Sequence, residues 1–127
     1  MQIVPRHKGD DQACNNLRAA PDEEVILHLD ALLECLQDIN WPIAGPVSER
    51  LACLGVELVE PVFRILKGDD EVWKYWIVSH FLYQVKFEVL ARLRFLLHSM
   101  RAHPSRAEVE EEVHDVVCAL LQNRRHG

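Results

Sequence analysis

An internal repeat of about 30 residues limits what this chain can fold into more than any other feature of its sequence. Within each repeat the apolar residues recur at spacings of three and four, which predicts helices, and no strand-like alternation persists. A shift of 30 residues, followed by one of 36, aligns two sets of apolar positions: Val47, Ile77 and Val113, and Leu51, Phe81 and Val117. A single helical hairpin cannot bury both of its apolar stripes, so we expect three hairpins to stack side by side.

The segments that interrupt the apolar pattern divide the chain into six main helices. These are expected at about 21–37, 40–55, 57–66, 70–84, 87–101 and 106–122, with a short helix at about 12–19. Gly68 is placed to end the third helix, Asp69 to cap the fourth, and Ser105 with Glu108 to form a capping box for the sixth. The 127 residues fit a single domain. Its expected parts are an N-terminal extension or cap (1–20), hairpins at about 21–55, 56–85 and 86–122, and a frayed tail (123–127).

Several short segments resemble known families. The turns Leu36-Gln-Asp38 and Leu66-Lys-Gly-Asp69 are similar to the turn of the HEAT-like repeat, and that resemblance implies an all-α fold, a short right-handed α-α superhelix. Leu36-Gln-Asp-Ile-Asn-Trp-Pro42 and Asp70-Glu-Val-Trp-Lys-Tyr-Trp76, together with the opening Val4-Pro-Arg-His-Lys8, resemble a bacterial family of small all-helical domains of unknown function. The resemblance implies a fold and no particular activity.

The expected helix at 70–84 is apolar almost all round and holds most of the aromatic side chains. Core packing explains such a helix. A second interpretation is a binding groove, because Trp73, His80 and Gln84 lie within about 60° on this helix. The second helices of stacked hairpins line a concave face, and Trp41 begins the equivalent helix one repeat earlier. We therefore take Trp41, Trp73, His80 and Gln84 as the candidate binding site.

Acidic residues gather in the first hairpin. Positions 22–38 hold six acidic residues and no Lys or Arg. Glu23, Asp30, Glu34 and Asp38 would share one side of a continuous helix there. A solvated outer face is the simplest interpretation, and the alternative is a surface for a basic partner. The net charge of −6 argues against general nucleic-acid binding.

Motifs for catalysis or cofactor binding are missing from the sequence. The serines lack a Gly-x-Ser-x-Gly motif, the glycines form no phosphate-binding loop, and the cysteines form no Cys-x-x-Cys pair. We therefore expect no catalytic residue, metal or cofactor. The longest run without a charged residue has 11 residues, and a membrane span needs about 20. Free cysteines within apolar runs are typical of a reducing compartment, so we expect a cytoplasmic protein that does not contact membranes.

The function that these features favour is binding of a protein or peptide through the Trp-rich concave face. A narrower alternative is an immunity-type inhibitor that covers the basic surface of a toxin. A second alternative is a HEAT-like nucleic-acid repair enzyme with Trp73, Trp76 and Asp70 around an extruded base. Net negative charge and short length argue against that enzyme. A structural or regulatory subunit is the third possibility, and the sequence leaves the oligomeric state open.

Overall fold

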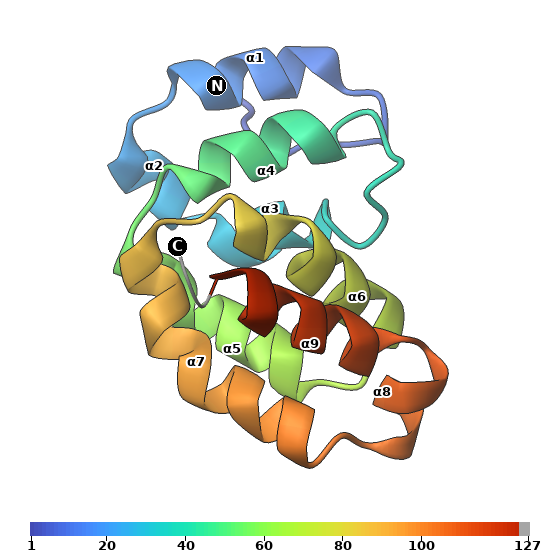
Figure 1. Cartoon of the computed structure of the whole chain (residues 1–127). Coiled ribbons are helices and arrows are strands. Elements are labelled where there is room, and N and C mark those ends of the chain that lie inside the picture. The colour runs from blue at the N-terminus through green and yellow to red at the C-terminus, as the bar shows by residue number, and fades with distance from the viewer. Residues whose placement is uncertain (125–127) are drawn as a thin grey trace.

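The structure, a computed structural model, describes residues 1–124, and these residues form α-helices and 3-10 turns without a β-strand (Figure 1). The α-helices are α1 (Asp11–Ala19), α2 (Asp22–Ile26), α3 (Leu29–Glu34), α4 (Ala44–Ala52), α5 (Val59–Lys67), α6 (Glu71–Ser79), α7 (Phe87–Ala102), α8 (Arg106–Glu110) and α9 (Val113–Arg124). The 3-10 turns are η1 (Val56–Leu58) and η2 (Phe81–Tyr83). Helix α9 includes the first two positions of the expected tail, and the other three lie outside the described residues.

Burial of the aligned apolar positions supports the repeat. Val47, Ile77 and Val113 are fully buried, and so are Leu51, Phe81 and Val117. These side chains come from α4, α6, η2 and α9, so the second half of each repeat contributes to one core. Phe63 departs from the pattern. It is 42% exposed, whereas Leu33 and Leu93, which lie 30 residues before and after it, are fully buried.

Two of the expected helices are interrupted. The helix expected at about 21–37 breaks between α2 and α3, where the His28 N–H donates to the Val25 carbonyl at 3.0 Å. This three-residue bond is tighter than the four-residue bond of an α-helix. Leu27 is exposed at this break. The sixth breaks between α8 and α9, where Glu112 has a φ of 67°. The Glu112 N–H donates to the Val109 carbonyl, three residues back, at 3.3 Å, so the chain leaves the four-residue bonding of an α-helix at this point.

Other helix ends also differ from the sequence-based prediction. Helix α4 begins at Ala44 rather than near Asn40, because the Asp38 carboxylate accepts the Asn40 N–H at 2.9 Å and forms a turn there. Helix α6 ends at Ser79, and its cap is Asp70 rather than Asp69. By contrast, the capping box at the start of α8 and the start of α7 at Phe87 are as predicted.

The left-handed backbone of Glu112 provides a test of local strain. Replacement of Glu112 by glycine should raise the free energy of unfolding by up to about 1 kcal/mol, because glycine adopts positive φ without a Cβ clash. Ala107→Gly, inside α8, should instead lower it by about 1 kcal/mol. Urea unfolding of both variants measures the two effects, and destabilisation of the protein by Glu112→Gly would contradict the strain.

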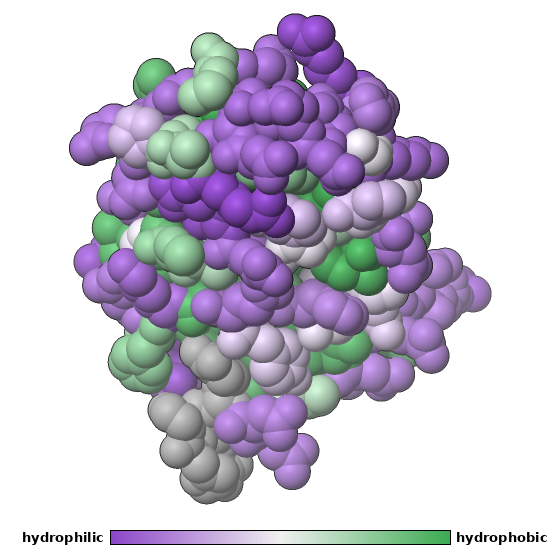
Figure 2. All heavy atoms as spheres, turned by 90° about the horizontal axis from the view of Figure 1, so that it is seen from above, coloured by the Kyte–Doolittle hydropathy of each residue, from purple (hydrophilic) through white to green (hydrophobic). Residues whose placement is uncertain are grey.

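Helix α1 is fixed to the body of the protein by Arg50 of α4, and the two helices are in contact. The Arg50 guanidinium donates to the carbonyls of Leu17 (3.3 Å) and Ala20 (3.0 Å) at the end of α1. It also pairs with Asp22 at 2.6 Å. The surface on the α1 side is mainly hydrophilic, and its apolar areas are small and scattered (Figure 2).

A buried charge network joins α6 to α8. The Lys74 side chain is buried, and its ammonium donates to Glu71 at 3.2 Å and to Glu108 at 3.0 Å. The other Glu108 oxygen accepts the Ser105 N–H at 2.8 Å and completes the capping box. Burial raises the pKa of Glu108, but the hydrogen bonds from Ser105 and Lys74 outweigh it and hold that pKa below its usual 4.5.

This lowered pKa predicts how stability depends on pH. At pH 7 the protein should be about 1.5–3 kcal/mol more stable than its Glu108→Gln variant, because the charge-assisted hydrogen bonds of Glu108 are lost. Glu108 has a lower pKa in the folded state than in the unfolded state, so its contribution is present above about pH 4.5. It disappears as the pH falls through the folded-state pKa. Urea titrations between pH 7 and pH 3 should therefore show the gap closing, and a constant gap would contradict the assignment.

Candidate functional site

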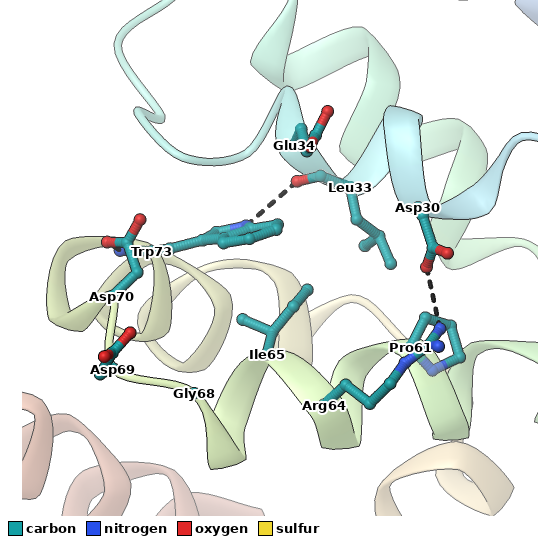
Figure 3. A pocket seen from close by; sticks show the side chains of 10 residues that line it. All are labelled: Asp30, Leu33, Glu34, Pro61, Arg64, Ile65, Gly68, Asp69, Asp70 and Trp73. Carbon is teal, nitrogen blue, oxygen red and sulfur yellow. Dashed lines mark hydrogen bonds and ion pairs between the residues drawn. The ribbon is translucent and has the colours of Figure 1, made fainter.

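An open cleft lies between α3, α5 and the start of α6 (Figure 3), and we call it the acidic cleft. Its volume is about 360 Å³. The residues that line it are Asp30, Leu33, Glu34, Pro61, Arg64, Ile65, Gly68, Asp69, Asp70 and Trp73. The cleft therefore brings Trp73 of the predicted groove together with Asp30 and Glu34 of the predicted acidic surface.

Trp73 forms one wall of the acidic cleft and is fixed at two points. The Asp70 carboxylate accepts the Trp73 backbone N–H at 3.1 Å and caps α6. The Trp73 indole Nε1–H donates to the Leu33 carbonyl at 3.1 Å, in the last turn of α3. Figure 3 shows the indole extending from α6 toward α3, with the Leu33 and Ile65 side chains beside it. The apolar surface of the cleft is thus positioned by hydrogen bonds.

The rim of the acidic cleft carries an excess of negative charge. Asp30 and Arg64 pair at 3.0 Å at one end, and Asp69 and Asp70 lie at the other (Figure 3). The side chains of Glu34 and Asp69 are exposed and make no hydrogen bond or ion pair within the described part of the chain. Four carboxylates face one guanidinium, so three negative charges remain uncompensated. Such a cleft suits a cation on an apolar stem.

The four residues of the predicted groove do not share one cavity. Trp41 is half-buried and lines a second hollow of about 260 Å³, where the Lys8 ammonium lies 5.4 Å from the indole centre. Glu34 lines both this hollow and the acidic cleft. His80 is exposed with its ring 5.2 Å from Trp76, and Gln84 donates to Ser48 Oγ at 3.5 Å. Neither His80 nor Gln84 lines the two hollows.

The four residues of the predicted acidic surface are also divided. Asp30 and Glu34 line the acidic cleft, whereas Glu23 is exposed on α2 and Asp38 forms the turn before α4. The break between α2 and α3 separates Glu23 from Asp30 and Glu34, and Asp38 lies beyond the end of α3. Sequence reasoning missed Asp69 and Arg64 as cleft residues. Asp69 could have been found, since it lies in the repeat turn four residues before Trp73.

Some side chains could be mistaken for catalytic groups, and their geometry does not fit such a role. The Cys118 sulfur lies 3.6 Å from His114 Nε2, which is also 3.0 Å from the Arg101 carbonyl oxygen. A carbonyl oxygen only accepts, so Nε2 carries the proton and cannot take one from the thiol. Burial raises the pKa of Cys35 to about 11, which keeps that thiol protonated. The repair-enzyme alternative placed Trp73, Trp76 and Asp70 around an extruded base. Asp70 and Trp73 line the acidic cleft, whereas Trp76 lines a different hollow.

The part of the chain that the structure describes contains neither a metal-binding cluster nor a membrane-spanning helix. Residues 1–124 contain no group of three His, Cys, Asp or Glu side chains arranged to hold a metal ion. Over the same residues, no helix has both the length and the apolar character to cross a bilayer.

Comparison with known proteins places the chain in a family without an assigned activity. No curated protein shows a significant match to it. The family model that does match is described as a domain of unknown function, DUF5071, and it spans residues 3–121. The match agrees with the sequence resemblance to a family of unknown function. The all-helical fold that this resemblance implied is found in residues 1–124. With the match covering nearly the whole chain, the protein belongs to the DUF5071 family.

Proposed function

We propose that the protein is a binding module that recognises a basic segment of a partner protein. The observation that carries the proposal is the acidic cleft, where uncompensated carboxylates surround an apolar surface formed by Trp73 and Ile65. A lysine or arginine side chain has a matching shape and charge, because its apolar stem can lie on the indole while its head reaches Glu34 or Asp69.

The helix pairs support a scaffold of three stacked hairpins of the HEAT-like type. Contacts join α3 to α4, α5 to α6, and α7 to α9. The Asp30–Arg64 ion pair and the Trp73–Leu33 hydrogen bond link the first pair to the second. In this arrangement the acidic cleft lies at the junction of two repeats, where a stiff scaffold presents residues from both.

The second hollow extends the proposed binding surface. Glu34 lines both the acidic cleft and the hollow of Trp41, so an extended peptide could follow both. Arg6 and Lys8 line that hollow, so the part of the peptide that lies there should be apolar or acidic rather than basic. An immunity-type inhibitor of a basic toxin is a narrower version of the same function. Association would then be fast and sensitive to salt.

Peptide binding tests this proposal. The probe is a fluorescent peptide with a central lysine between two leucines, measured by fluorescence polarisation at 0.15 M salt beside matched peptides with norleucine or glutamate at the centre. We expect the lysine peptide to bind best. Glu34→Lys and Asp69→Lys should each weaken it at least tenfold, since a carboxylate contact is replaced by repulsion.

Glu23→Lys is the matched control, because it makes the same charge change outside the acidic cleft. It should alter the affinity by no more than about twofold, since salt screens exposed charges beyond about 8 Å. The proposal fails if the glutamate peptide binds as well as the lysine peptide. It also fails if Glu23→Lys weakens binding as much as Glu34→Lys does.

A further inference from the structure

A second pocket, of opposite charge, lies between α7 and α9, which are in contact and run side by side (Figure 1). We call it the α7–α9 pocket, and its volume is about 120 Å³. The residues that line it are Leu90, Arg94, Leu97, His98, Arg101, Leu120 and Leu121. It shares no residue with the acidic cleft or with the hollow of Trp41.

The α7–α9 pocket combines an apolar floor with a cationic edge. All four leucines are buried. Arg94, His98 and Arg101 are spaced by four and three residues, which places them on the same side of α7. None of the lining residues is acidic. Charge and apolar surface are therefore separated within one small cavity.

Within residues 1–124, no carboxylate pairs with the cations of this pocket. Arg94 is half-buried, and its guanidinium makes no ion pair or hydrogen bond with these residues. Arg101 lies 3.0 Å from His98 Nδ1, and because a guanidinium only donates, that ring nitrogen accepts. In the part of the chain that the structure describes, neither guanidinium group is paired with a carboxylate, although the chain has a net charge of −6. A half-buried cation without a partner is stabilised when an anion binds.

We propose that the α7–α9 pocket binds a small amphiphilic carboxylate, with its carboxylate on Arg94 and Arg101 and its apolar chain on Leu90 and Leu121, the two leucines of the pocket that keep some exposed surface. The planar guanidinium matches the two oxygens of a carboxylate. The buried leucines favour a short aliphatic chain or a single ring over a fully polar anion. This site is independent of the proposed recognition of a basic partner.

The test uses hexanoate as the probe and the intact protein with labelled leucine methyl groups. Titration followed by NMR should give saturable shifts in the methyl signals of the pocket leucines. Hexylamine, with the same chain and the opposite charge, should produce no such shifts. Acetate should bind at least tenfold more weakly than hexanoate, because it lacks most of the apolar chain.

Variants of α7 complete the experiment. Arg94→Gln and Arg101→Gln should each weaken hexanoate at least tenfold. Arg92→Gln is the control, because Arg92 is exposed on the same helix and does not line the pocket. The inference is overturned if hexylamine shifts the same signals, if hexanoate does not saturate, or if Arg92→Gln weakens it as much as the two pocket variants do.

Discussion

Replacing Lys74 with methionine is expected to lower the free energy of unfolding by about 3–5 kcal/mol, the usual cost of leaving half of a buried ion pair behind. The Lys74 ammonium is the cation shared by the largely buried carboxylates of Glu71 and Glu108. Methionine keeps much of the volume of the side chain but donates no hydrogen bond. Both carboxylates would then lose their counter-charge, and the link between α6 and α8 would be lost.

Urea unfolding at pH 7 measures this loss, with Lys67→Met as the control. Lys67 is exposed at the end of α5, so its replacement should change stability by no more than about 0.5 kcal/mol. Adding Glu108→Gln to Lys74→Met should recover part of the loss, because one stranded charge is removed. Equal effects of Lys74→Met and Lys67→Met would show that the buried network contributes little.

Replacing Phe81 with alanine should cost about 3–5 kcal/mol through lost burial and the cavity that remains. Phe81 is fully buried, as are Leu51 and Val117, with which the sequence shift aligns it. The loss should appear as a lower urea midpoint with little change in the slope of the transition.

Phe95→Ala is the matched control, since it makes the same chemical change at a side chain that is 88% exposed on α7. It should alter stability by no more than about 0.5 kcal/mol. If the two variants were equally destabilised, Phe81 would not occupy the centre of the core, and the burial pattern of the repeat would be wrong.

The sequence predicted the helices well where local signals and core packing agree. Helix α7 begins at the expected residue, and the Ser105–Glu108 capping box forms as the pattern indicates. The prediction was wrong where apolar spacing continued across a break. Leu27 fits the helical pattern by type but is 79% exposed, because the chain bends between α2 and α3. Spacing alone records which residues are apolar and does not record such a bend.

The candidate site was predicted only in parts, because it depends on contacts between segments that are far apart in the sequence. Trp73 and Glu34 were each selected from the sequence, but in different proposed surfaces. Their meeting in one cleft depends on the indole hydrogen bond to Leu33, which joins residues 40 positions apart. Arg94 and Arg101 carried no signal as a pair, because their pocket is completed by leucines of α9. Contacts between distant segments of this kind are not encoded in local spacing.

The hydrogen bonds from Arg50 to the end of α1 affect how easily this helix detaches from the rest of the protein. If α1 lifted away from α4, the carbonyls of Leu17 and Ala20 would lose their donor and the guanidinium would lose its partners together. Detachment of the N-terminal segment therefore carries a cost shared with α4. Helix α1 should therefore resist proteolysis to the same degree as α4, on which it packs.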